Sequence, residues 1–116
     1  MITGKDVRRM VSSSKMIYDK YGFEMPITIT LVQPDQVVSI LNISFNKNLP
    51  NQKDKAYHLY EELNVELAKK GIYPYRSGIL GMDKISFQDL GKNATFKILK
   101  NSLDPNNIIS PGRYGI

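Results

Sequence analysis

The chain has 116 residues, a formal net charge of +5 at pH 7, one histidine and no cysteine. Without cysteine there is no disulfide framework and no thiolate for a metal or a nucleophile, and one histidine leaves little for a zinc site. No apolar run approaches the roughly 20 residues that span a bilayer, and no apolar secretory core lies near the start, so we expect a soluble, cytoplasmic protein without a membrane partner.

Residues 4–21 are predicted to form the first helix. Side chains suited to a core recur there at intervals of three and four residues, which places them on one stripe: Val7, Met10, Val11, Ser14, Ile17, Tyr18 and Tyr21. This is the spacing of an amphipathic helix, and we interpret its methionine and tyrosines as core residues and not as ligand-binding ones. Gly22 is expected to end the helix in a left-handed conformation.

Two strands follow. In residues 27–32 isoleucine and leucine alternate with threonine and valine, and residues 37–45 show a second alternation, with Leu41, Ile43 and Phe45 on one face. The intervening Gln33–Gln36 segment is a turn, with Pro34 preset for its second position. The pattern predicts an antiparallel hairpin. Two strands alone are marginal in water, so this hairpin needs helices or further strands.

A second helix is predicted over residues 52–70, with Asn51 as its cap and Gly71 at its end. Its apolar stripe consists of Ala56, Leu59, Tyr60, Leu63 and Leu67. His58 lies off this stripe beside two glutamates, so we interpret it as a surface residue without a catalytic role.

The predicted fold is therefore of the α+β class. Residues 1–72 form an α-β-β-α unit, half of a ferredoxin-like arrangement, in which helices cover one side of an antiparallel hairpin. The unpaired strand edges predict either a homo-oligomer or a piece of a larger protein. Residues 73–116 are expected to add short helices, one near Ser86 and one over 93–102, and then an extended or disordered tail rich in proline and glycine.

An unusual stretch runs from Gly71 to Asp83. It contains Tyr75 next to Arg76, after Pro74 and before two glycines. Arginine offers a planar, permanently charged fork for an oxyanion, tyrosine adds a directional hydroxyl, and glycine lets the backbone approach a ligand. A proline-containing turn with a surface arginine is the simpler interpretation of the same residues.

The run YRSGILGMDKI at 75–85, followed by a helix and by LDPNNIISPGRYGI at 103–116, resembles the carboxyl end of a flavoprotein family. That family comprises vanillyl-alcohol oxidase and 4-cresol dehydrogenase (p-cresol methylhydroxylase), which are FAD-dependent oxidoreductases. The tail motif is widespread among related flavin oxidases, and the Tyr-Arg pair narrows the resemblance to the phenol-oxidising branch. The first 72 residues are compatible with the cap domain of the family.

The resemblance implies roles for three residues. Tyr75 and Arg76 would hold the phenolate oxygen of an aromatic substrate, and Arg113 would lie at the same pocket or at the flavin edge. The implied reaction is hydride transfer from a para-alkyl phenol to FAD. In the family a separate amino-terminal domain binds FAD, and these 116 residues contain no Gly-rich pyrophosphate loop. We therefore expect no FAD tightly bound to this chain alone, and an FAD-binding polypeptide as a partner.

Two other functions are compatible with parts of this sequence. An α-β-β-α module can bind RNA, but these strands carry no aromatic stacking platform and the chain has no GxxG loop, which argues against a nucleic-acid partner. A stand-alone oligomeric scaffold or regulatory domain, derived from the flavoenzyme and without catalysis, remains an open alternative.

Overall fold

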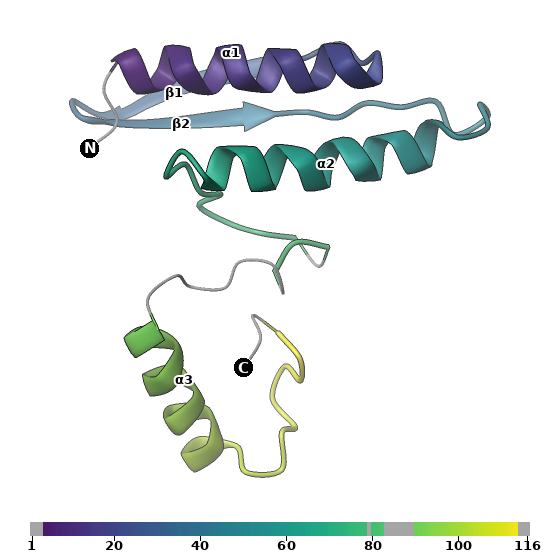
Figure 1. Ribbon diagram of the computed structural model, residues 1–116. Helices are drawn as coiled ribbons and strands as arrows, with labels where there is room; N and C mark the ends of the chain where they lie inside the picture. The colour runs from purple at the N-terminus through teal and green to yellow at the C-terminus, as the bar shows by residue number, and fades with distance from the viewer. Residues whose placement is uncertain (1–3, 79, 83–89, 114–116) are drawn as a thin grey trace. The chain divides into compact units, whose positions relative to one another are not determined.

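The computed structural model describes residues 4–78, 80–82 and 90–113, the last without the side chains of 90–93. Their elements, in chain order, are α1 (Gly4–Tyr21), β1 (Ile27–Gln33), β2 (Gln36–Leu41), α2 (Gln52–Ala68) and α3 (Leu90–Leu103) (Figure 1). The chain divides into two compact units, Met1–Tyr73 and Pro74–Ile116. The α+β class is confirmed, and α1 has the predicted bounds. No described helix has both the length and the apolar character that a membrane crossing requires.

The hairpin has the predicted antiparallel pairing. Ile27 lies opposite Leu41, and the register is irregular only near the turn. The second strand was predicted to continue to Phe45, which is wrong, because β2 ends at Leu41. The Asn42 N–H still donates to the Pro26 carbonyl at 3.2 Å. Proline has no N–H to donate in return, so the ladder stops at this point.

Helices α1 and α2 end in the same way. Gly22 and Gly71 adopt φ of +73° and +74°, and the next residue, Phe23 or Ile72, donates its N–H to a carbonyl five residues earlier, at 2.9 and 3.0 Å. These are the left-handed glycine stops that the sequence predicts. Asn51 precedes α2 as predicted, but its side chain makes no capping hydrogen bond, because its backbone is left-handed at φ 67°.

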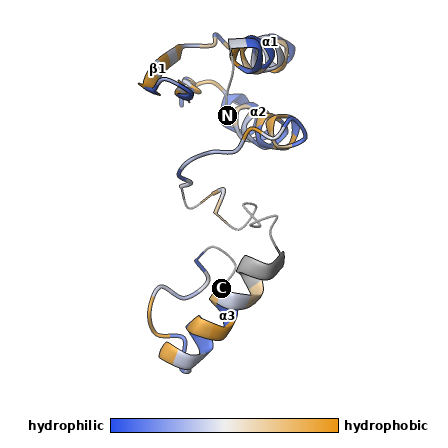
Figure 2. Cartoon of the chain, turned by 90° about the vertical axis from the view of Figure 1, so that its left-hand side faces the viewer, coloured by the Kyte–Doolittle hydropathy of each residue, from blue (hydrophilic) through white to orange (hydrophobic). Residues whose placement is uncertain are grey.

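The core of the first unit lies between α1 and α2. Ile17 and Tyr18 of α1 form a buried cluster with Leu59 and Leu63 of α2. Partly buried side chains from the helices, the loops and the end of β2 pack around it: Tyr21, Phe23, Met25, Leu41, Ile43 and Leu67. The two helices lie on the same side of the hairpin (Figure 2). The predicted stripes thus face one another, and His58 is exposed, as expected.

Tyr18 anchors this core to the hairpin. The residue is 0% exposed, and its hydroxyl donates to the carbonyl of Asn42 at 3.0 Å. Burial raises the pKa of Tyr18 from 10.0 to about 12. The folded state therefore keeps this proton to a higher pH than the unfolded state does. The stabilisation is complete below pH 10.0 and is lost as the pH rises through the folded value.

Tyr18→Phe is expected to lower the free energy of unfolding by about 1 kcal/mol at neutral pH, because the Asn42 carbonyl loses its donor. The variant should also lose less stability than the wild type between pH 10.0 and about 12. Urea unfolding at neutral pH and within that alkaline interval measures both effects. Tyr21 is present in both proteins, so the difference between them isolates Tyr18. Equal alkaline losses would show that Tyr18 is accessible to solvent.

Ser14 is a polar residue inside the same helix interface. It is 0% exposed, and its hydroxyl has no hydrogen-bond partner among the described residues. Ser14→Ala is therefore expected to raise the free energy of unfolding by about 1 kcal/mol or more, because the desolvation cost of the hydroxyl disappears. The exposed Ser12 of the same helix provides the control, since Ser12→Ala changes helix propensity alone, by about 0.5 kcal/mol. Thermal or urea unfolding measures both variants. An equal rise in the free energy of unfolding in Ser14→Ala and Ser12→Ala would mean that the Ser14 hydroxyl has a partner in solution.

The hairpin is covered only at one end. Ile29 and Leu31 share the face of Leu41, yet they are 46% and 67% exposed, and Ile40 on the other face is 47% exposed. Within the described part of the chain the sheet has only these two strands. The hairpin therefore presents apolar side chains and two unpaired edges.

The second unit contains α3 and the tail. α3 begins at Leu90, earlier than the predicted residue 93, and the short helix expected near Ser86 lies outside the described residues. Leu99 and Leu103, predicted to share one side of this helix, are 49% and 78% exposed. Residues 104–113 form neither helix nor strand, as the sequence predicts. The extended course expected for them is wrong, because turns and the bonds of Asp104 to Ile108 and Ile109 fold this segment back.

Candidate functional site

Met82 is held in a turn that follows the Tyr-Arg pair. The N–H groups of Gly81 and Met82 donate to the carbonyl of Gly78 at 3.0 and 3.2 Å. Met82 is 6% exposed, the only buried hydrophobic side chain in the described part of the second unit. No pattern in the sequence predicts a role for this residue. A buried methionine in a glycine-rich turn indicates a packing partner from another segment.

That partner is Arg113 of the tail. One terminal guanidinium nitrogen, Nη1, donates to the Met82 sulfur at 3.5 Å. Ser110 to Arg113 form a turn in which the Arg113 N–H donates to the Ser110 carbonyl at 3.3 Å. Pro111 occupies its second position, and Gly112, at φ +71°, the third, which a type II turn requires. The Arg113 side chain therefore reaches Met82 from the end of a proline-glycine turn.

Asp104 shapes the tail between α3 and this turn. Its carboxylate oxygens accept the N–H groups of Ile108 and Ile109, both at 2.8 Å. Lys100, one turn back on α3, donates to the same carboxylate and to the Ile109 carbonyl. The hydrogen bonds from Lys100 and Ile108, which are the strongest influences, lower the pKa of Asp104, so it is ionised at neutral pH. The LDPNN motif thus encodes a closed loop.

Tyr75 and Arg76 lie on the surface. Tyr75 is 68% exposed and Arg76 is also exposed. Neither has a hydrogen-bond or ion-pair partner in the described ranges, and neither is bonded to Arg113. The structure therefore joins the two motif-bearing segments through Met82 and Arg113, without assembling the three predicted residues into one hydrogen-bonded set.

The donors of Arg113 suit an anion. A guanidinium carries five N–H groups, and the contact with Met82 uses one of them. The side chain is exposed, and its remaining donors have no acceptor among the described residues, so they are available to an anionic oxygen of a ligand. Within the described part of the chain, this arrangement could serve one anionic edge of a cofactor such as FAD but offers no cradle for a pyrophosphate. No group of three potential metal-binding side chains occurs among the described residues.

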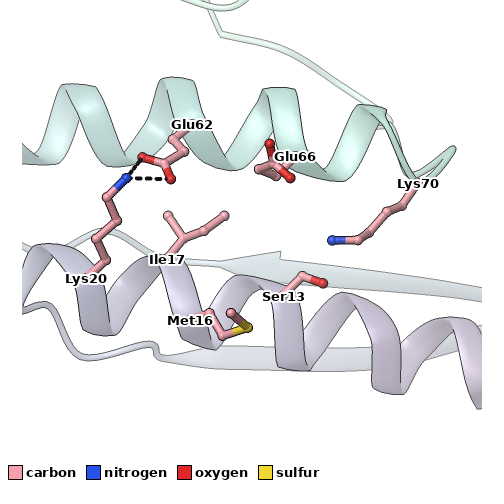
Figure 3. Close-up of a pocket in the computed structure, with 7 residues that line it drawn as sticks. All are labelled: Ser13, Met16, Ile17, Lys20, Glu62, Glu66 and Lys70. Carbon is pink, nitrogen blue, oxygen red and sulfur yellow. Dashed lines mark hydrogen bonds and ion pairs between the residues drawn. The ribbon is translucent and has the colours of Figure 1, made fainter.

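A hollow lies in the first unit. This shallow pocket between α1 and α2 has a volume of about 220 Å³ (Figure 3), and its lining contains charged, polar and apolar side chains: Ser13, Met16, Ile17, Lys20, Glu62, Glu66 and Lys70. None of the three predicted site residues lines it.

Two charged groups of this pocket, Lys20 and Glu62, are bonded to each other. Lys20 donates to both Glu62 oxygens at 2.8 and 2.7 Å, and the Tyr21 hydroxyl donates to one of them at 2.7 Å. These bonds lower the pKa of Glu62, and the bond from Lys20 has the larger effect. In turn, the bond to Glu62 raises the pKa of both Lys20 and Tyr21. The carboxylate stays ionised and its donors stay protonated near neutral pH, so this cluster is a poor general acid or base.

Curated proteins match nearly the whole chain. One is the 4-cresol dehydrogenase [hydroxylating] flavoprotein subunit of Pseudomonas putida, 27% identical over 115 residues, which are 97% of this chain and 22% of that subunit. Another is the 1'-carboxy-chondrochloren decarboxylase of Chondromyces crocatus, 26% identical over 112 residues, 97% of this chain and 21% of the decarboxylase. No family model and no solved structure matches. The chain spans about a fifth of the length of these relatives, and the similarity supports a distant relationship to flavoprotein oxidoreductases.

Proposed function

We propose that this chain supplies part of the substrate cap and the phenolate clamp of an FAD-dependent oxidoreductase that acts on para-alkyl phenols. The observation that carries the proposal is the match to the 4-cresol dehydrogenase flavoprotein subunit over 97% of the chain. The contact between Arg113 and Met82 gives it physical support, because it links the two segments that bear the family motifs. The partner of the chain in this reaction is a polypeptide that binds FAD.

Tyr75 and Arg76 would act on the phenol oxygen. A guanidinium and a phenolic hydroxyl that donate to this oxygen favour its ionised form. Ionisation pushes electron density toward the para carbon and so makes the benzylic hydrogen easier to remove as hydride. Both side chains are exposed and unpaired among the described residues, so they can turn toward a substrate without breaking a bond.

FAD would accept the hydride when bound. Arg113 would meet an anionic oxygen at the edge of the flavin or of the substrate, since its charge is not neutralised by a described carboxylate. The chain's contribution is then position and electric field, while the redox chemistry belongs to the cofactor.

A segment exchange tests this function. The matching segment of the Pseudomonas putida subunit would be replaced by this chain, and oxidation of 4-cresol by the purified chimera would be followed with an artificial electron acceptor. We expect the chimera to retain flavin absorbance and measurable turnover, while a subunit from which the segment is deleted has none. A chimera that holds flavin and melts cooperatively, yet turns over no faster than the deletion, would contradict the proposal.

The second candidate, a non-catalytic oligomeric scaffold, is favoured by the exposed hairpin. Unpaired edges and exposed apolar side chains such as Leu31 favour pairing with a second copy of the chain. We expect sedimentation velocity to detect a dimer or a higher closed oligomer at micromolar concentration.

Leu31→Lys should weaken this association, because it places a charge where Leu31 is 67% exposed. Val65→Lys on α2, where Val65 is 55% exposed, is the matched control and should leave the association unchanged. A monomer that melts cooperatively at every concentration would contradict self-association and leave an FAD-binding partner as the remaining way to cover the hairpin.

A further inference from the structure

Asp104 occupies a place where a carboxylate is unfavourable. It follows the carboxyl end of α3 directly, where the helix dipole is negative, and its side chain is only 7% exposed. Burial of a charge also disfavours its ionised form. The structure compensates with a salt bridge from Lys100, itself 16% exposed, and with two backbone N–H donors. Such a site needs a reason beyond the ending of a helix, for which a glycine or an asparagine would suffice.

The donors of Asp104 come from the tail. The bonds from Ile108 and Ile109 close residues 104–109 into a loop, and Lys100 reaches the same loop through the Ile109 carbonyl. Ser110 follows at once and begins the turn that ends at Arg113. The loop that Asp104 closes and the turn that carries Arg113 are therefore contiguous along the chain.

We propose that the Lys100–Asp104 pair is a positioning device that fixes the tail so that Arg113 rests against Met82 with its charge available to an anionic ligand oxygen. The charge of Arg113 stays available because of the groups that accept hydrogen bonds around it. Asp104, the described carboxylate of the tail, is occupied by Lys100 and by backbone N–H groups, and the acceptor that meets Arg113 is an uncharged sulfur. A thioether is a weak acceptor, so it orients the guanidinium without neutralising it. The role of Arg113 toward a ligand rests on the proposed function, whereas its positioning does not.

The test uses nuclear magnetic resonance on the full chain, without flavin or substrate. The ¹³C-methyl signal of Met82 reports the contact, and its position in Arg113→Ala defines the state without it. Amide hydrogen exchange at Ile108 and Ile109 reports closure of the loop. In Asp104→Asn, which is nearly isosteric but loses the charge and one acceptor, exchange at both amides should be about tenfold faster or more. The Met82 signal should move toward its position in Arg113→Ala.

Two further variants separate positioning from folding. Lys100→Met keeps both backbone hydrogen bonds of the carboxylate and removes the ammonium. It should therefore speed amide exchange at Ile108 and Ile109 and shift the Met82 signal in the same direction as Asp104→Asn, but by less. Lys97→Met, an exposed lysine on the same helix, is its control and should change nothing. If amides of α3 also lose protection in Asp104→Asn, that variant has disturbed the helix itself. The exchange rates and the Met82 signal of Lys100→Met then test the proposal.

The proposal is overturned if the Met82 signal keeps its wild-type position in Asp104→Asn while the loop amides exchange faster, or if neither changes. It is equally overturned if Arg113→Ala leaves the Met82 signal unmoved, because the contact would then be absent in solution. Failure of the 4-cresol assay would leave these results intact. Loss of the positioning would likewise leave open whether Tyr75 and Arg76 bind a phenolate.

Discussion

Arg76→Ala is expected to lower kcat/KM for a para-alkyl phenol by about ten- to a hundredfold in the flavoprotein chimera that contains this chain. A charge-assisted hydrogen bond to the phenolate contributes roughly 1.5–3 kcal/mol, and each 1.36 kcal/mol corresponds to about a factor of ten. Steady-state kinetics measures the loss. Because Arg76 has no ion-pair partner among the described residues, its removal leaves no buried charge unpaired, and the loss should reflect the ligand alone.

The pH profile distinguishes this role from a general loss of structure. The rate should fall mainly below the pKa of the free phenol, where the protein must stabilise the anion, and should approach that of the unchanged chimera above it. Tyr75→Phe should show a smaller loss, because tyrosine donates from a neutral group. Arg76→Ala with unchanged turnover and an unchanged profile would identify Arg76 as a turn residue at the surface.

Leu59→Ala is expected to lower the free energy of unfolding of the first unit by about 2–5 kcal/mol. The side chain is 0% exposed and lies in the cluster with Ile17, Tyr18 and Leu63, so truncation leaves a cavity in the only cluster that joins α1 to α2 in the described residues. Small domains are stable by only about 5–15 kcal/mol, so the loss is a large part of the total. Urea unfolding followed by circular dichroism measures it.

Val65→Ala is the control on the same helix. Val65 is 55% exposed, and the change should alter the free energy of unfolding by about 0.5 kcal/mol or less. If both variants unfold at the wild-type urea concentration, the α1–α2 interface does not stabilise the unit, and the assignment of its core is wrong.

The elements that could be predicted are those with a local signal. The stripe from Met10 to Tyr18 and the glycines at 22 and 71 predicted α1 and both helix ends, since periodicity and left-handed stops depend on near neighbours. The end of β2 depends instead on Pro26, which directly precedes the other strand, and alternation along one strand contains no such information. The capping bond of Asn51 was also mispredicted, because its backbone is left-handed, a conformation that asparagine permits without requiring.

The site was only partly predictable. The motifs identified Arg113, but its contact with Met82 joins residues 31 positions apart, and no local pattern specifies such a pair. Asp104 and Lys100 did have a local signal, a lysine four residues before an Asp-Pro at the end of a helix, which favours a salt bridge on one helix face. Their bonds to the tail depend on the left-handed backbone of Asn107, at φ 50°, which the sequence permits without requiring.

The ionisation state of a bound phenol tests the central claim most directly. A para-nitrophenol changes its visible absorbance when it loses its proton, and difference spectra against the flavin-containing chimera report that change on binding. At a pH below the pKa of the free ligand, we predict that the bound ligand is ionised, and that Arg76→Ala returns it to the neutral form. A ligand that binds the chimera in its neutral form, equally tightly with and without Arg76, would contradict the claim that this chain carries a phenolate clamp.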